Sequence, residues 1–138
     1  MTPPSPRVQG DGPADTDPLL VLIVDDNETN RKLARDVLRA AGLRALEAGS
    51  ATEGMALAGE HLPDVILMDL RLPDMDGTDA ARALAADERT RGIPVVALSA
   101  LPLERDGDWV AAAGFAGSLA KPISVDEFPD EVRRYCTR

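Results

Sequence analysis

Aromatic side chains are scarce in this sequence, where one Trp, one Tyr and two Phe make up 3% of 138 residues. A core therefore has to be assembled from Ala, Val, Leu and Ile. The hydrophobic fraction of 44% is nevertheless typical of a globular protein. The length suffices for one domain with a full core and is too short for two.

Cysteine is nearly absent as well. The single Cys136 excludes an internal disulfide and is typical of a protein kept in the reducing cytoplasm. No apolar run is long enough to cross a bilayer, and the N-terminus has no signal-peptide pattern. We therefore expect a cytoplasmic protein that does not associate with membranes.

Basic residues are outnumbered, since 15 Lys and Arg stand against 24 Asp and Glu and the formal net charge is −9. A charge of this sign argues against binding nucleic acid or an anionic membrane surface through a basic face. We expect neither among the partners of this chain.

Residues 1–18 differ in composition from the rest of the chain. They contain five of the eleven prolines, with Gly, Asp and Ser between them. Such a segment cannot bury enough apolar surface to fold. We predict a disordered Pro-rich leader at 1–18 and one folded domain at 19–138; a sorting or docking role for the leader stays open.

Five short apolar runs follow one another along the folded part, and they are typical of strands in a parallel sheet. Segments with helical spacing of apolar residues lie between them. Strands and helices that alternate with short links predict a doubly wound α/β fold. The predicted strands cover residues 19–24, 43–48, 65–68, 94–98 and 115–120, the second of which is half polar and suits a sheet edge.

Capping signals locate several of the helices. Ser50 and Glu53 form a capping box at the start of the second helix. Leu33 in the first helix and Leu62 in the second are expected on buried faces. The predicted helices cover about 28–41, 51–62, 78–87, 108–113 and a final segment that begins near 124 or near 129.

The start of the final helix has two interpretations. Ser124 and Glu127 have the spacing of a second capping box. Pro129 would remove a hydrogen bond from a helix that began there. The helix therefore either has an irregular first turn or begins near Pro129.

Four of the five predicted strands end in polar or charged residues. The carboxyl ends of parallel strands meet at one edge of a sheet, where ligands of such folds bind. Asp69 is the most informative of these residues. A carboxylate at the end of a buried strand costs free energy unless a cation or hydrogen-bond donors contact it. The strand-end residues are Asp25 with Asp26, Asp69, Ser99 and Lys121.

The chemistry of these residues points to a phosphoryl group and a metal ion. Three carboxylates at one edge raise one another's pKa unless a cation lies between them. Oxygen ligands near a phosphate suit Mg²⁺. With Lys121 as a positive charge and Ser99 as a hydroxyl donor, the set can stabilise a phosphoryl group carried by Asp69. Asp74 and Asp76, in the loop that follows, are interpreted as solvated rather than as ligands.

Four motifs in this order resemble the receiver domain of two-component response regulators. The resemblance covers about residues 19–135 and implies a flavodoxin-like (βα)5 sheet with strand order 2-1-3-4-5. It is closest in kind to the single-domain receivers of cell-division and phosphorelay regulators. The motifs are LIVDDNE at 22–28, LMDLRLPDMDG at 67–77, IPVVALSA at 93–100 and LAKPI at 119–123.

The resemblance implies a role for each matching residue. Asp69 would be the phosphoacceptor, while Asp25, Asp26, Asp69 and the backbone carbonyl of Arg71 would hold Mg²⁺. Ser99 and Lys121 would contact the phosphoryl group. No enzymatic activity is implied beyond self-phosphotransfer and slow autodephosphorylation.

The resemblance also implies partners. The phosphoryl donor would be a sensor histidine kinase or a histidine phosphotransfer protein, and the output a downstream protein. The sequence ends after the last predicted helix, so we expect a stand-alone receiver without an attached output domain. We expect it to be a monomer or weak dimer. Such a protein would signal through residues 99–121 and that helix.

Three positions depart from the family pattern or bear on its kinetics. The family commonly has Tyr or Phe three residues before the lysine, where this chain has Ser118, so coupling to the output surface is expected to be weaker or differently routed. Arg71 and Leu101 flank the site where the family tunes loss of the phosphoryl group. Bulky residues there predict a long-lived phosphorylated state.

Three other functions compete with this one. A receiver-like interaction module that is independent of phosphorylation is favoured by Ser118. A phosphohydrolase with an aspartate nucleophile generally needs a second acid where this chain has Arg71. A dinucleotide site needs glycines after the first strand, where Asp25 and Asp26 would repel a pyrophosphate.

Overall fold

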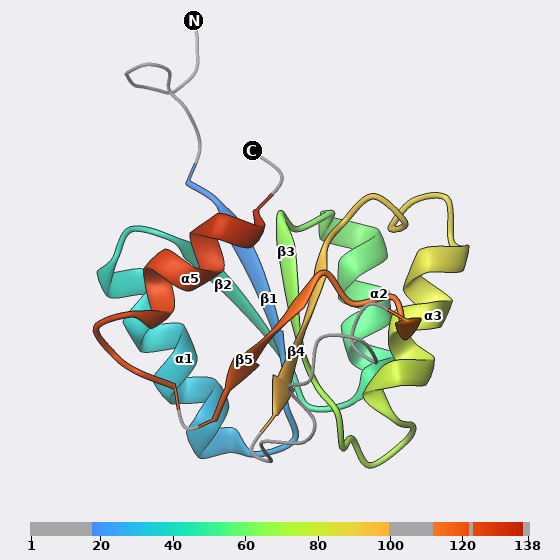
Figure 1. Cartoon of the computed structure of the whole chain (residues 1–138), viewed down its shortest axis with the longest axis horizontal. Coiled ribbons are helices and arrows are strands. Elements are labelled where there is room, and N and C mark those ends of the chain that lie inside the picture. Colours follow the sequence, from blue (N-terminus) through green and yellow to red (C-terminus); the bar gives the residue numbers. More distant parts are fainter. Residues whose placement is uncertain (1–17, 100–111, 122, 137–138) are drawn as a thin grey trace, which may run out of the picture.

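The computed structural model describes residues 18–99, 112–121 and 123–136, and these form a parallel sheet with helices on both faces (Figure 1). The strand order is β2-β1-β3-β4-β5, which confirms the expected doubly wound fold. β2 lies at one edge, as its half-polar sequence predicts. The strands are β1 (Leu20–Val24), β2 (Arg44–Ala48), β3 (Val65–Asp69), β4 (Val95–Ser99) and β5 (Gly117–Ala120).

Helices α1 and α5 cover one face of the sheet, and α2 and α3 cover the other (Figure 1). Because successive strand residues point to opposite faces, β1 contributes Val21 and Ile23 to the α1 and α5 side, and Leu22 and Val24 to the α2 and α3 side. This burial on both faces explains why the central strands are continuous apolar runs. The helices in the described part are α1 (Glu28–Ala40), α2 (Ala51–His61), α3 (Gly77–Ala86) and α5 (Phe128–Tyr135).

The last helix begins at Phe128, which supports the later of the two predicted starts. Its N-cap is Glu127 and its first turn contains Pro129, where a missing N–H costs nothing. The predicted capping box at Ser124 is wrong: the Ser124 carbonyl accepts from the N–H groups of Glu127 and Phe128 in a preceding turn. The capping box at Ser50 is confirmed, since its side chain accepts from the Glu53 N–H.

Two leucines expected on buried faces lie at the surface. Leu62 is 56% exposed because it leaves α2 in a left-handed conformation with φ of 50°. Leu33 is 42% exposed, and α1 buries Ala34 and Leu38 instead. The predicted helix in α1 is confirmed, but fewer of its apolar residues are buried than the spacing predicts.

Several predictions lie outside the described residues. They are the leader at 1–17, most of the helix at 108–113, and the positions of Leu101 and Trp109. None of the helices in the described segments has the length and apolar character needed to cross a bilayer.

Candidate functional site

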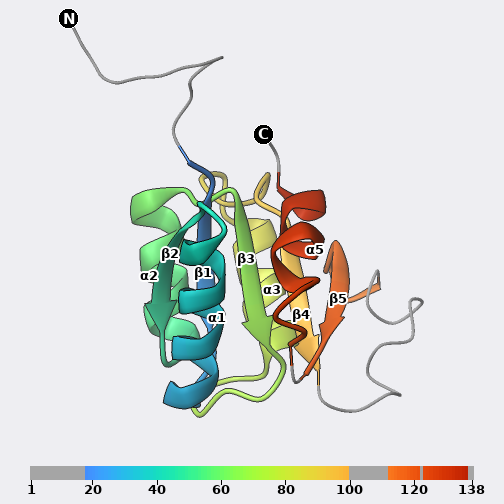
Figure 2. The ribbon, with the colours of Figure 1, turned by 90° about the vertical axis from the view of Figure 1, so that its left-hand side faces the viewer.

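The strands bring the predicted acids to one edge of the sheet. Val24 of β1 pairs in register with Met68 of β3. Asp25 follows Val24 and Asp69 follows Met68, so the two acids come at the same level of adjacent strands. Asp69 in turn pairs with Leu98 of β4, the residue before Ser99. The strand arrows in Figure 2 point to this same edge. Residues separated by tens of positions therefore meet because the sheet is parallel and in register.

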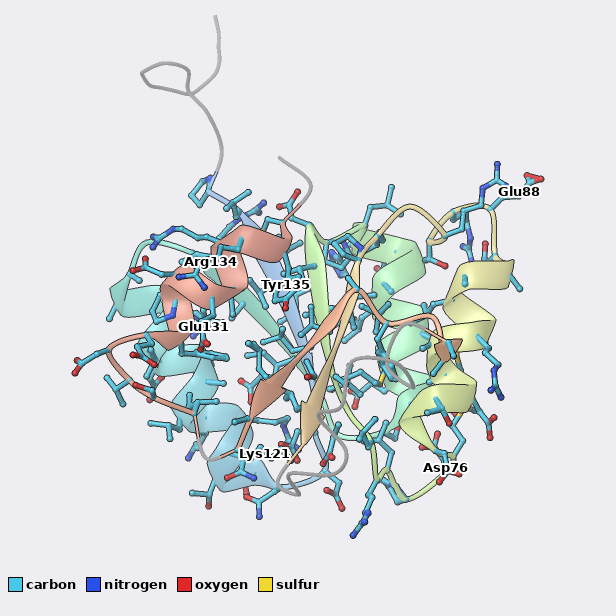
Figure 3. The ribbon with its side chains drawn as sticks, viewed as in Figure 1. Asp76, Glu88, Lys121, Glu131, Arg134 and Tyr135 are labelled. Atoms are coloured by element: carbon cyan, nitrogen blue, oxygen red, sulfur yellow. The ribbon has the colours of Figure 1, made fainter. Side chains whose placement is uncertain are left out.

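Lys121 bridges two of the acids. Its Nζ lies 3.0 Å from Oδ2 of Asp25 and 3.0 Å from Oδ2 of Asp69. Lys121 follows β5 and lies at the same edge of the molecule as Asp76 (Figure 3). The Asp25 carboxylate is buried and the Asp69 carboxylate is nearly so, with 2% and 12% of the side chains exposed. The lysine therefore neutralises charge where water screens it poorly.

Backbone donors fix the orientation of both carboxylates. The Asn27 N–H donates to Oδ1 of Asp25 over 2.9 Å, and the Arg71 N–H donates to Oδ1 of Asp69 over 3.2 Å. Each carboxylate thus has one oxygen on the backbone and the other on Lys121. This arrangement fixes both carboxylates close to one another, with the Lys121 ammonium between them.

The electrostatics of Asp69 favour a further cation. Burial raises the pKa of the Asp69 carboxyl, and the charge of Asp25 acts in the same direction. Hydrogen bonds from Lys121 and the Arg71 N–H lower that pKa without outweighing burial. For Lys121, burial lowers the pKa, but hydrogen bonds to Asp69 and Asp25 outweigh it and the net pKa is raised. The lysine stays charged, while the negative charge of Asp69 is incompletely compensated.

The acids fit a divalent metal ion. Asp25, Asp26 and Asp69 each offer one carboxylate oxygen, and these oxygens all lie within 4.8 Å of one another. The three carboxylates and one ammonium leave a formal charge of −2, which one divalent cation balances. Asp26 is exposed, so water can complete the coordination as Mg²⁺ requires.

Ser99 is the last residue of β4, and its backbone pairs in register with Ala120 of β5. That placement sets Ser99 next to the strand that leads into Lys121. The sheet therefore gathers the backbone of every predicted site residue at one edge.

Two further residues make contacts at or next to this site that the sequence does not predict. Arg31 of α1 donates from Nη1 to the Asp25 carbonyl over 2.7 Å and lies 3.5 Å from a Glu47 carboxylate oxygen. Asp74 is exposed, as expected for a loop residue, and it also bonds to the first turn of α2. Its carboxylate accepts from the Ala51 and Thr52 N–H groups and from the Thr52 hydroxyl. Nothing local in the sequence signals the contact of Asp74 with α2, more than twenty residues away.

Gly77 allows the loop after β3 to close against the strand. A Cβ at this position would collide with the Asp69 carbonyl oxygen and the Leu70 Cα. We expect Gly77→Ala to destabilise the fold by about 1–3 kcal/mol, the range of overpacking substitutions. Urea unfolding measures the change. Gly92→Ala is the matched control, because a Cβ there meets nothing within 4 Å; equal stability of the two variants would contradict the prediction.

The pH dependence of stability should reveal the contacts of Asp74. Hydrogen bonds from Thr52, and then from Ala51, lower the pKa of Asp74 from 3.8 to about 2. A depressed folded-state pKa contributes stability that is present above the unfolded value and is lost as pH falls toward the folded value. The urea midpoints of the parent and of Asp74→Asn should therefore differ most at neutral pH and converge below about pH 4. A difference independent of pH would contradict the assignment.

Comparison with known proteins identifies similar sequences. Residues 21–133 match the sequence profile described as the response regulator receiver domain. The polar-differentiation response regulator DivK of Brucella ovis is 40% identical over 115 residues, which cover 83% of this chain and 94% of that protein. The DivK of Brucella anthropi is 38% identical over 118 residues, covering 86% and 96%.

Solved structures with the same fold are also found. The chemotaxis response regulator CheY4 of Vibrio cholerae aligns with a TM-score of 0.79 at 25% identity, covering 86% of this chain and 98% of that one. The receiver domain of sensor histidine kinase PA1611 from Pseudomonas aeruginosa aligns with a TM-score of 0.76 at 33% identity, covering 86% and 97%. That second structure holds a magnesium ion coordinated in its active site cleft.

Proposed function

Because this chain belongs to the response regulator receiver family of two-component signalling, we propose that Asp69 accepts a phosphoryl group from a phosphohistidine partner in a Mg²⁺-dependent reaction. The observation that carries the proposal is the position of Asp69. Its carboxylate lies at the mouth of a buried strand, 3.0 Å from the Lys121 ammonium, within an acid cluster suited to a divalent ion. The change in phosphorylation state would then alter binding to a downstream protein.

The residues have separable roles in the transfer. An Asp69 oxygen attacks phosphorus, the new O–P bond forms as the P–N bond to the donor imidazole breaks, and the imidazole keeps the electron pair. The Lys121 ammonium and the Ser99 hydroxyl pair with phosphoryl oxygens. Asp25, Asp26, Asp69 and the Arg71 carbonyl would hold Mg²⁺, which when bound neutralises charge on the transferring group. Arg31 and the Asn27 N–H keep Asp25 in place.

The experiment is an intact-mass measurement after incubation with acetyl phosphate. A mass gain of one phosphoryl group that requires Mg²⁺ and disappears with a chelator supports the proposal. An unmodified mass in the presence of Mg²⁺ contradicts it. The lifetime of the product tests the expectation, drawn from Arg71 and Leu101 in the sequence, of a long-lived phosphorylated state. Loss of the group within seconds would contradict that part.

A groove beside the acids suits the donor protein. It lies between α1 and the connection from β5 to α5, and its volume of about 40 Å³ is far below the roughly 300–1,000 Å³ of small-molecule sites. The groove therefore fits a side chain of a partner protein better than a nucleotide. Its apolar lining includes Leu33, Ile123 and Phe128, and Asp25 and Lys121 also border it. A sensor histidine kinase or a histidine phosphotransfer protein would dock here.

The route to the output surface differs from the usual aromatic switch. Ser118 pairs in register with Ala97 and lies on the α2 and α3 side of the sheet. The aromatic ring that packs on the neighbouring Gly117 is Tyr135 of α5, on the opposite side (Figure 3). Tyr135 therefore does not replace an aromatic at position 118.

Coupling is accordingly expected to be weak along β5. Amide exchange with and without beryllium fluoride, a phosphoryl mimic, measures it. We expect only partial protection changes across residues 100–117, because a serine is too small to fill the space that an aromatic would occupy on switching. Full protection across that segment would contradict the prediction.

The second candidate is a receiver-like interaction module that does not depend on phosphorylation. Ser118 favours it, and the intact cluster of Asp25, Asp69 and Lys121 disfavours it. Partner binding that is unchanged by beryllium fluoride and by the Asp69→Asn substitution would select this alternative. In either case the single Cys136 suits the cytoplasm, and we expect a monomer or weak dimer without enzymatic activity toward other substrates.

A further inference from the structure

Asp74 joins the loop after β3 to the first turn of α2. Its Oδ1 accepts from the Ala51 N–H over 2.9 Å, and its Oδ2 accepts from the Thr52 N–H over 2.8 Å and from the Thr52 hydroxyl over 2.6 Å. Helix N-termini leave such donors without intrahelical partners. Here a carboxylate from a loop more than twenty residues away satisfies them.

The same loop is closed at its base into a small hairpin. Arg71 and Asp76 form an antiparallel bridge, and the Gly77 N–H donates to the Leu70 carbonyl over 2.9 Å. The Arg71 N–H donates to Oδ1 of Asp69. Asp74 lies at the tip of this hairpin. The hairpin is therefore held at the base by β3 and at the tip by α2.

Helix α2 is itself packed tightly on β1. Gly54 approaches the Val24 side chain so closely that a Cβ would lie 2.7 Å from a Val24 methyl carbon. Val24 directly precedes Asp25 and Asp26. The contacts of Asp74 thus connect the hairpin that carries Arg71 to the strand that carries the first two acids.

We propose that Asp74 is a positioning residue of the metal site, which sets the location of the Arg71 carbonyl relative to Asp25 and Asp26. The inference rests on the proposed function, in which that carbonyl is a Mg²⁺ ligand. A backbone ligand has no rotamer to adjust, so it moves only with its loop. Mg²⁺ requires near-ideal octahedral geometry, which makes its affinity sensitive to a small displacement of one ligand.

A carboxylate is the side chain that suits this task. Two oxygens can accept three hydrogen bonds at once, whereas an amide at the same position would present a donor to part of the set. The positive end of the α2 dipole also favours a negative charge there. With a pKa of about 2, Asp74 stays ionised and its contacts persist at any physiological pH.

Isothermal titration with MgCl₂ alone tests the proposal without any phosphodonor. We expect Asp74→Ala to weaken Mg²⁺ binding about tenfold, the lower end of what residues supporting metal ligands contribute. Thr52→Val, which removes the hydroxyl contact and leaves the backbone donors, should weaken it less. Asp76→Asn is the matched control. It removes one negative charge from the same loop, the Asp76 side chain makes no helix-capping hydrogen bond, and the variant should bind Mg²⁺ as the parent does.

A second readout separates positioning from lost stability. Phosphorylation by acetyl phosphate, followed against Mg²⁺ concentration, should show a raised half-saturating Mg²⁺ for Asp74→Ala with an unchanged maximal rate. A folded Asp74→Ala or Thr52→Val that binds Mg²⁺ like the parent would overturn the proposal. Equal weakening of Mg²⁺ binding in Asp76→Asn would also overturn it, because the loss of negative charge alone would then explain the effect. If the parent binds Mg²⁺ but is not phosphorylated, the proposed function fails while the titration still decides the role of Asp74. A parent that binds no Mg²⁺ overturns both.

Discussion

Asp69→Asn is expected to abolish phosphorylation. The asparagine amide is not a nucleophile toward phosphorus, and the neighbouring Asp25 is buried and bonded to Lys121 and the Asn27 N–H. Intact mass after incubation with acetyl phosphate and Mg²⁺ measures the effect. The parent should gain one phosphoryl group and the variant none.

Asp76→Asn is the control for this substitution. It makes the same chemical change seven residues along the chain, at an exposed position in the same loop. The control should be phosphorylated like the parent. Phosphorylation of Asp69→Asn at the parent's rate would show that the acceptor is another residue.

Asp69→Asn should remain folded. A raised folded-state pKa for an acid means that its ionised form is less favourable in the folded chain than in the unfolded chain, so its stability contribution is lost as pH rises through that pKa. Replacing Asp69 with a neutral side chain removes this unfavourable charge. We expect a melting temperature at neutral pH that is no lower than the parent's. An unfolded variant would contradict this and would make its lack of phosphorylation uninformative.

Lys121→Ala is expected to have the second-largest effect. Removing the ammonium leaves the Asp25 and Asp69 carboxylates without their ion-pair partner, although only 2% and 12% of their side chains are exposed to water. Breaking a buried ion pair costs about 3 kcal/mol at the lower end of its range. In metal-free buffer the variant should therefore melt well below the parent. Phosphorylation should slow about 10²–10³-fold, the loss typical of removing one charge-stabilising donor.

Magnesium should partly reverse the loss of stability. In Lys121→Ala, a bound divalent ion supplies the positive charge that the lysine supplied in the parent. The ion also meets no competition from the lysine for the Asp25 and Asp69 carboxylates. We expect added Mg²⁺ to raise the melting temperature of Lys121→Ala more than that of the parent. Lys32→Ala, at an exposed position on α1, is the matched control and should change neither quantity. An equal rise in melting temperature with Mg²⁺ in the parent and both variants would contradict this account of the acid cluster.

The positions of Asp25 and Asp69 could be predicted from the sequence because both follow apolar runs that only a buried strand explains. Parallel pairing then requires their ends to meet. The pairing of Lys121 with both acids at once could not be predicted, since it depends on how β5 and the segment after it approach β1 and β3. The helix start at Phe128 was ambiguous for a similar reason: the local signals of Ser124 and Pro129 conflict, and a turn held by backbone hydrogen bonds decides between them.

The sequence by itself determined the succession of strands and helices along the chain, the two-sided burial of the central strands and the identity of the residues at their carboxyl ends. These follow from periodicity and from turn chemistry, which act over a few neighbouring residues. Only the tertiary structure decided that Asp74 binds α2, that Arg31 holds the Asp25 carbonyl and that Leu33 borders a groove instead of filling the core. The first and third depend on the distance between segments remote in the chain, which is set by the packing of the whole domain. The second spans only six residues and depends on how α1 is oriented after β1.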